Sequence, residues 1–157
     1  MAIRRQDGKT GPVGKNRKGK DAKTMNRIIS DTREQKAYRF PGATRTALET
    51  GDYSIEGLEN KVAVERKTRN DLLSCIGTER DRFTRELERL SKFDLAVIMI
   101  ECNFRDMLNL PNWSELHKSQ VFGSILSWIP KYGVVFFFAG SRKMGERATK
   151  KILEKYK

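Results

Sequence analysis

The stretch Val62–Asp71 (VAVERKTRND) constrains the fold more than any other part of the chain. Successive side chains of an extended strand point to opposite faces of a sheet, so Glu65 and Lys67 share one face and Arg66 lies on the other. A carboxylate and an ammonium group therefore lie side by side where this strand ends. The pattern predicts a β-strand whose last residues carry charge into a common site.

The run before this strand, Leu48–Asn60, predicts a β-hairpin. It breaks at Glu56–Gly57 before the apolar sequence resumes, which indicates that the chain folds back alongside itself. Asp52 then lies opposite Glu65 and Lys67. Two carboxylates about 4 Å apart repel by about 4 kcal/mol at an effective dielectric of about 20, so they share a proton or hold a cation. A hard divalent ion with oxygen ligands, Mg²⁺ or Mn²⁺, is the simplest solution.

The overall charge favours a polyanionic partner. The 157 residues include 32 Lys and Arg against 20 Asp and Glu, a net charge of +12, and such a surface attracts nucleic acid. The alternative is that the charge only keeps the protein soluble. The length fits one domain. Since the sequence has no membrane-spanning apolar run and no hydrophobic signal core, we expect no membrane association and no secretion, but an intracellular protein, cytoplasmic or with the host DNA.

The cysteines and the single histidine narrow the chemistry further. Cys75 and Cys102 each lie in apolar sequence, which favours reduced packing residues over a disulfide and disfavours a zinc site. With His117 alone, two-histidine ribonuclease chemistry is excluded. Carboxylates and lysine remain as the main catalytic groups, and we expect His117 to cap or pack near the start of a helix.

Residues 1–26 are rich in Lys and Arg, contain little that is apolar, and have only Asp7 and Asp21 as acids. This composition predicts a flexible basic arm ahead of a folded domain over residues 27–157. Such an arm adds affinity for a polyanion but little sequence preference. The alternative is an inert terminal tail.

The rest of the sequence alternates predicted strands and helices, which indicates an α/β domain with a mixed central sheet. Continuous apolar runs predict two central strands that helices cover on both faces. The predicted elements are a strand at Arg27–Asp31, a turn at Pro41–Gly42, helices that begin at Thr68, Thr78 and Ser141, a helix from Ser114 to about Trp128, and central strands at Phe93–Glu101 and Gly133–Gly140.

Two features of these elements bear on function. The first strand delivers Asp31, with Glu34 soon after it, to the end of the sheet where Asp52 is expected, and this enlarges the anionic pocket. Taken alone, Asp31 is better explained as a turn or cap residue, since Asp before Thr commonly closes a strand. In the Ser114 helix, small residues recur every four positions and permit close packing against the sheet or a second subunit. A second copy of this chain is therefore one partner that the sequence suggests.

Three motifs in order resemble the XPF-type structure-specific nuclease domain. They are DTRE at Asp31–Glu34, GDY at Gly51–Tyr53 and ERKTRND at Glu65–Asp71, and RFTREL at Arg82–Leu87 is similar to the arginine-containing helix that follows them in that family. The resemblance extends from about Arg27 to the C-terminus. Three motifs in the right order are far more specific than one acidic-x-Lys element.

The resemblance implies a restriction-endonuclease-like fold and metal-dependent cleavage of branched, flapped or forked DNA, as in DNA repair or recombination. Asp52, Glu65 and the Arg66 carbonyl would ligate Mg²⁺ or Mn²⁺, and Asp31 and Glu34 would complete the pocket, with Asp31 as a further metal ligand. Lys67 would orient the attacking water and stabilise the charge on the phosphate. By the same resemblance Arg33, Arg66, Asp71 and Arg82 would contact phosphates or support the site.

Two departures separate the chain from that family. Glu86 stands where the family usually has Gln. The sequence ends without the tandem helix-hairpin-helix domain that grips duplex arms and joins two subunits, so branch selectivity is not implied together with the catalytic residues. Two other functions fit the composition: a noncatalytic DNA-binding module with the same fold, and a basic RNA-binding protein in which the ERK strand is only a charged edge.

Overall fold

The strands form one mixed six-stranded sheet in a computed structural model that describes residues 27–156. The sheet order is β2-β1-β3-β4-β5-β6. β1 pairs antiparallel with β3 and β3 with β4, whereas β4, β5 and β6 are parallel. The strands are β1 Ile28–Ser30, β2 Thr44–Arg45, β3 Tyr53–Ile55, β4 Val62–Lys67, β5 Leu95–Ile100 and β6 Val135–Phe138. The predicted basic arm lies outside the described residues.

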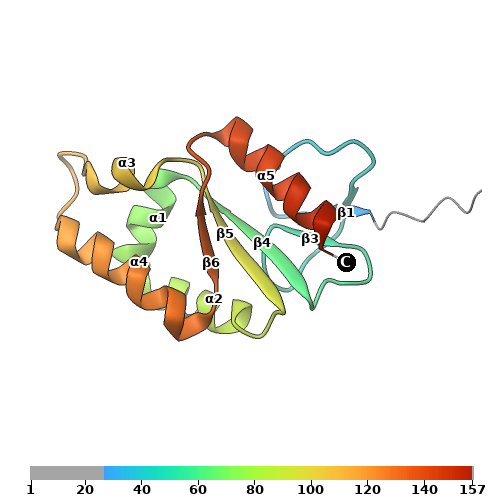
Figure 1. The fold of residues 1–157 in the computed structure, drawn as a ribbon, viewed down its shortest axis with the longest axis horizontal. Helices are drawn as coiled ribbons and strands as arrows, with labels where there is room; N and C mark the ends of the chain where they lie inside the picture. The colour runs from blue at the N-terminus through green and yellow to red at the C-terminus, as the bar shows by residue number, and fades with distance from the viewer. Residues whose placement is uncertain (1–26, 157) are drawn as a thin grey trace, which may run out of the picture.

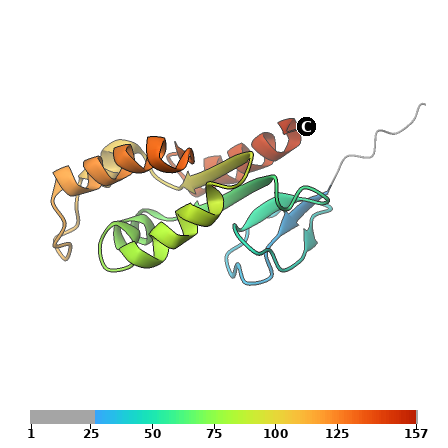
Figure 2. The same ribbon diagram turned by 90° about the horizontal axis from the view of Figure 1, so that it is seen from below.

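Helices cover both faces of the sheet, as Figure 1 shows, so the predicted α/β class with a mixed central sheet flanked by helices is confirmed. The helices α1, α2 and α4 pack on one face and α5 packs on the other. The view in Figure 2 places β1 and β3 at the end of the molecule away from α4. The helices are α1 Arg69–Ile76, α2 Arg80–Leu90, α3 Phe104–Leu108, α4 Lys118–Tyr132 and α5 Arg142–Lys155.

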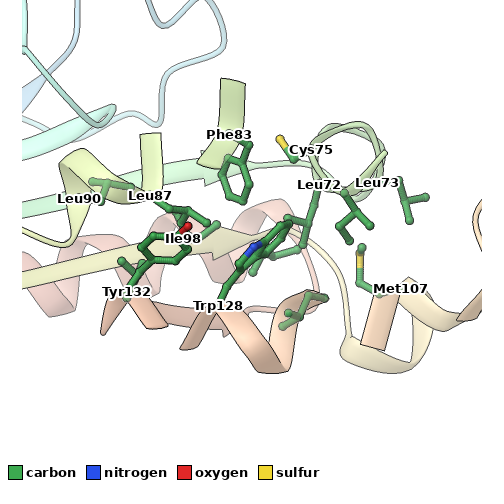
Figure 3. Close-up of a cluster of buried hydrophobic side chains, with 14 of the residues drawn as sticks. Leu72, Leu73, Cys75, Phe83, Leu87, Leu90, Ile98, Met107, Trp128 and Tyr132 are labelled. Atoms are coloured by element: carbon green, nitrogen blue, oxygen red, sulfur yellow. The ribbon is translucent and has the colours of Figure 1, made fainter. Parts of the chain in front are cut away.

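The alternation along β4 decides which residue faces which layer. Ala63 belongs to the apolar cluster beneath α1, α2 and α4, whereas Val62 and Val64 belong to the cluster beneath α5. Glu65 and Lys67 therefore lie on the α1/α2 face, and Arg66 lies on the α5 face. In the first cluster, Figure 3 shows side chains from α1 and α2 packed around Ile98 and Trp128.

The helix that follows β4 starts as the sequence predicts. Thr68 Oγ1 accepts a hydrogen bond from the Asp71 N–H at 3.2 Å, and Asp71 Oδ2 accepts one from the Thr68 N–H at 3.0 Å. This reciprocal capping box fixes the start of α1 directly after the ERK residues. The helix therefore holds the end of β4 in a defined direction.

Two predicted helix starts are wrong. The Thr78 helix begins at Arg80 with no side-chain cap, because the backbone bonds Glu79 N–H to Ser74 O and Arg80 N–H to Gly77 O already satisfy that turn. The Ser114 helix begins only at Lys118, after His117, whose N–H donates to the Gln120 side chain. His117 therefore marks the start of α4, as predicted.

Two further predictions need correction in this part of the fold. α4 continues past the predicted end at Trp128 to Tyr132, with Pro130 in its last turn. The strand β6 lies at the sheet edge and not at its centre, with Val135 and Phe137 more than 40 % exposed. No strand pairs with the outer side of β6 within residues 27–156, and the helix α5 packs over β4 and β5. The apolar run of β6 therefore forms an edge strand, although its sequence pattern is the one expected of a central strand.

The turn that precedes Asp52 requires glycine at position 51. Gly51 has a φ of +88°, and a Cβ added there would lie 3.0 Å from Ala63 Cβ on the neighbouring strand. Gly51→Ala is expected to lower the free energy of unfolding by about 2 kcal/mol. Alanine disfavours the left-handed backbone conformation at this position, and its Cβ would also lie too close to Ala63. Gly42→Ala is the matched control, since Gly42 also has a positive φ but has open space around it. Urea denaturation of both variants measures the contact, and equal losses would contradict it.

Candidate active site

Three acids lie in one row across neighbouring strands. The β1–β3 register pairs Ser30 with Tyr53, and the β3–β4 register pairs Tyr53 with Val64. Continuing the β1–β3 register by one residue places Asp31 opposite Asp52, and Asp52 lies near enough to Glu65 for its charge to act on that carboxyl group. The Asp31 N–H donates to Asp52 O at 2.8 Å and the Asp52 N–H donates to Val64 O at 2.9 Å, so the backbone of Asp52 is tied both to the end of β1 and to β4. The predicted hairpin is confirmed, since β3 pairs antiparallel with β4.

Asp52 has one carboxylate oxygen engaged by the backbone. Its Oδ2 accepts a hydrogen bond from the Arg66 N–H at 2.7 Å. Burial raises the pKa of Asp52 to about 7, against the lowering effect of that hydrogen bond, and the nearby charge of Glu34 adds to the rise. The ionised form of this carboxylate is therefore disfavoured, and a bound cation would stabilise it.

Glu65 and Lys67 form an ion pair, and Glu86 of α2 lies near the same ammonium group. Lys67 Nζ lies 2.7 Å from Glu65 Oε1 and 3.5 Å from Glu86 Oε2. All three side chains are nearly buried, with exposed fractions of 10 % for Lys67, 12 % for Glu65 and 14 % for Glu86.

The same arrangement shifts both pKa values. Burial raises the pKa of Glu65 well above its usual range, and Asp52 adds to the rise. Burial acts to lower the pKa of Lys67, but Glu65 and Glu86 hold it above its ordinary value. Lys67 therefore carries a positive charge beside a carboxyl group whose ionised form is disfavoured.

Asp31 is buried but turned to structural partners. Its Oδ1 accepts from the Leu48 N–H at 3.0 Å, and its Oδ2 accepts from Arg33 Nε at 2.8 Å. Arg33 also donates to Leu48 O. These contacts tie the segment before Asp52 to the end of β1, so Asp31 and Arg33 shape the row from outside the Asp52 and Glu65 pair.

Arg66 is held on the opposite face of the sheet by Glu101. Its Nε lies 2.6 Å from Glu101 Oε1 and its Nη2 lies 3.2 Å from Oε2, a bidentate pair in which both side chains are under 10 % exposed. Glu34 is a second partner at 3.7 Å. Tyr38 Oη and Arg142 also donate to Glu101. Arg66 thus braces the hairpin from behind, and its backbone N–H serves Asp52.

A pocket of about 230 Å³ opens beside Lys67 between β4, α1 and α2. Asp71 lines it with its carboxylate engaged in the capping box, and Arg82 lies at its rim, 76 % exposed and 3.1 Å from Glu79. Of the predicted supporting residues, Asp71 and Arg82 thus lie beside Lys67. Arg33 lies beside Asp31, and the Arg66 side chain lies beside Glu101 on the opposite face of the sheet.

Sequence reasoning did not include Glu86 or Glu101 among the site residues. Glu86 sits between Phe83 and Leu87, both buried, so its helix packs closely enough to bring it to Lys67. Glu101 directly follows β5, and its N–H donates to Lys67 O at 3.0 Å. An acid at the end of a fully apolar strand beside β4 is the signal that points to Glu101.

The donor set suits a hard divalent ion with few protein ligands. Within residues 27–156, no three or more Asp, Glu, His or Cys side chains come close enough together to hold a metal ion. Mg²⁺ commonly binds through one or two carboxylates and keeps several waters, so it needs no third acid. Asp52 and Glu65 supply two carboxylates, and burial raises the pKa of each, so a bound cation would favour their ionised forms.

The raised pKa of Asp52 sets the sign of a pH dependence. The folded domain keeps this proton up to a pH of about 7, whereas the unfolded chain releases it near 3.8. Between these values the folded state holds more protons, so its stability falls as pH rises, by up to roughly 1 kcal/mol per pH unit from this group. Asp52→Asn is expected to be more stable than the parent by an amount that grows from pH 5 to pH 7. Urea denaturation in EDTA tests it, and a constant difference would contradict it.

The comparisons with known proteins agree with this geometry. Residues 30–151 match the ERCC4 domain, which is most of the chain. The chain belongs to the ERCC4 domain family. XPF from Aeropyrum pernix superimposes with a TM-score of 0.65 at 18 % identity over 81 % of this chain and 63 % of that one. Its complex with DNA gives 0.59 at 17 % identity over 80 % and 66 %. The ERCC4 domain thus has the XPF-type, restriction-endonuclease-like fold, as predicted.

One curated relative is much longer than the segment that it shares with this chain. A putative ATP-dependent RNA helicase of Methanocaldococcus jannaschii is 29 % identical over 133 residues, which cover 82 % of this chain. The match spans only 15 % of the relative's own length. Among the residues that the structure describes, no helix has the length and apolar character needed to cross a membrane.

Proposed function

We propose that this ERCC4 domain is a divalent-metal-dependent endonuclease that hydrolyses phosphodiester bonds in branched, flapped or forked DNA. The observation that carries the proposal is a pair of largely buried carboxyl groups, Asp52 and Glu65, whose charges act on each other and on Lys67, which lies 2.7 Å from Glu65; burial raises the pKa of both acids. A structural ion pair needs only one acid for one lysine. Two largely buried acids near one lysine are better explained by a cation that balances their charge.

Asp52 and Glu65 would hold Mg²⁺ or Mn²⁺, with the Arg66 carbonyl as a further oxygen ligand. The ion would supply a Lewis acid for the phosphoryl oxygen and a more acidic bound water. Lys67 would orient the attacking water and place positive charge against the phosphate as negative charge develops there. Glu34 and Arg66 would brace the acids, and Asp31 would fix the chain that carries Asp52.

DNA is the proposed substrate for two reasons. The net charge of +12 favours a polyanion, and the similar XPF of Aeropyrum pernix has been solved in complex with DNA. In this proposal Arg82, exposed at the rim of the pocket beside Lys67, contacts a backbone phosphate. Such contacts position the duplex without reading its sequence, which suits an enzyme that recognises branched DNA by shape.

One experiment tests the function against its main alternative. The purified protein is incubated with linear, flapped, forked and four-way DNA in Mg²⁺, Mn²⁺ or EDTA, together with Glu65→Ala and Lys67→Ala. Cleavage that requires the metal, prefers branched DNA and falls by about a hundredfold or more in both variants supports the proposal. Tight binding to these DNAs with no cleavage in either metal would identify a noncatalytic DNA-binding module instead.

A homodimer is the second part of the proposal. Large apolar side chains lie more than 40 % exposed on α4 and on β6, whose outer edge is unpaired within residues 27–156. We propose that a second copy of this chain covers them. The residues are Phe122, Leu126, Ile129, Val135 and Phe137. Leu126→Glu is expected to convert a dimer into a monomer in sedimentation equilibrium, because it buries an unpaired charge in the interface. Lys118→Glu, at the exposed start of α4, is the control, and a monomeric parent protein would contradict the proposal.

A further inference from the structure

The ammonium group of Lys67 is enclosed by residues from two different elements. Glu65 reaches it from β4 at 2.7 Å and Glu86 reaches it from α2 at 3.5 Å. The Phe83 ring, also from α2, lies 5.4 Å from Nζ. A lysine side chain has four flexible methylene groups, so its partners decide where the charge sits. α2 therefore supplies two of the three groups that define the position of Nζ.

The helix α2 is rigidly seated at this point. Phe83 and Leu87 are almost fully buried in the cluster beneath α1, α2 and α4, and Figure 3 shows both pointing into it. Phe83 also packs edge-on against Trp128 at 5.2 Å between ring centroids. Glu86 lies between these two anchors in the sequence, so the core fixes its backbone and only its own side-chain angles remain free.

The two acids that contact Lys67 differ in what else they do. Glu65 is a proposed metal ligand, and an ion on its carboxylate weakens its attraction for the ammonium group. Glu86 approaches Lys67 from α2, whereas Glu65 lies on β4, and its Oε2 lies 3.5 Å from the ammonium group. Its contact with Lys67 thus remains available when Glu65 is engaged by the metal.

We infer that Glu86 is a positioning residue that holds the Lys67 ammonium group in its catalytic place while Glu65 is occupied by the metal. The inference rests on the proposed nuclease function and adds a residue to it. Glu86 acts through Lys67 and touches neither the metal nor the DNA. The carboxylate provides an acceptor oxygen, and a glutamine at this position would provide one as well.

A double-mutant cycle tests whether Glu86 acts through Lys67. Glu86→Ala is expected to lower kcat for Mg²⁺-dependent cleavage by about 30-fold with KM within about threefold, because a misplaced catalytic group costs rate more than binding. In a Lys67→Ala background the same change is expected to cost no more than about twofold. Glu86→Gln is expected to recover most of the rate, and Glu88→Ala, exposed on the same helix, is the control. Additive losses in the double variant would overturn the inference.

Two further measurements do not depend on cleavage. Calorimetric titration of Mn²⁺ should give Glu86→Ala the affinity of the parent protein within about threefold, whereas a loss as large as that of Glu65→Ala would make Glu86 a metal ligand and overturn the inference. Acetylation of Lys67 by acetic anhydride, followed by mass spectrometry with Lys61 as internal reference, should be about fivefold faster in Glu86→Ala than in Glu88→Ala. Equal rates would also overturn it. A parent protein that cleaves no DNA refutes the proposed function alone, and the acetylation result still decides whether Glu86 holds Lys67.

Discussion

Glu65→Gln is expected to lower the rate of Mg²⁺-dependent DNA cleavage by at least about a hundredfold, or about 3 kcal/mol in the barrier. The variant replaces a proposed metal ligand by a neutral amide of nearly the same shape. Burial already disfavours the charged form of Glu65, and Lys67 keeps Glu86 as a partner. The free energy of unfolding is therefore expected to change by less than about 1 kcal/mol.

The combination of lost activity and retained stability is the informative result. Single-turnover cleavage of a flapped DNA measures the rate, and urea denaturation in EDTA measures the stability. Glu88→Gln is the matched control, since it makes the same chemical change at an exposed position of α2. Cleavage by Glu65→Gln within tenfold of the parent rate would show that this carboxylate does not take part in the reaction.

Arg66→Met is expected to lower the free energy of unfolding by about 3–5 kcal/mol, the largest stability loss that we predict. The change leaves Glu101 nearly buried without its bidentate partner, and it also removes the guanidinium group near Glu34. The methionine side chain retains the apolar stem of arginine, so the lost charge dominates the effect. The hydrogen bond from the residue 66 N–H to Asp52 is a backbone contact and does not depend on this side chain.

The control for Arg66→Met is an exposed ion pair of the same domain. Lys61 Nζ lies 3.5 Å from Asp94 Oδ2, with both side chains more than half exposed. Lys61→Met is expected to cost less than about 1 kcal/mol, because water screens and solvates both charges. Urea denaturation at pH 7 compares the two variants. Equal losses would mean that the Arg66–Glu101 pair does not brace the hairpin.

The residue pattern was sufficient to predict the part of the fold that carries the acids. Alternation along β4 places Glu65 and Lys67 on one face, and the break at Glu56–Gly57 returns the chain so that Asp52 comes near Glu65. These are local signals, since strand period, turn residues and the capping box at Thr68 each depend on a few neighbouring residues. They therefore predicted β3, β4 and the start of α1.

The parts that the sequence did not predict depend on distant packing. The apolar run that forms β6 predicts a strand, but its edge position depends on where α5 lies. The later start of α4 depends on the turn that His117 and Gln120 form, and Ser114 offered a similar capping pattern.

The same limit applies to the site. Glu86 and Glu101 reach Lys67 and Arg66 across 19 and 35 positions of the chain, respectively, and only the packed sheet and helices bring them there. Asp31 shows the reverse case. Its motif predicted a pocket residue, and its carboxylate in the structure is engaged by Leu48 and Arg33. The backbone register places it in the row of acids, but side-chain partners decide what it contacts.

The most direct test of the central claim is a calorimetric titration of Mn²⁺ into the parent protein, Asp52→Asn and Glu65→Gln at a pH above 7, where Asp52 is ionised. We expect one site in the parent protein and at least about a tenfold loss of affinity in each variant, because each removes one of two charged ligands. Glu88→Gln should bind as the parent does. If both Asp52→Asn and Glu65→Gln bind Mn²⁺ with the parent affinity, then these two carboxylates do not hold a common ion.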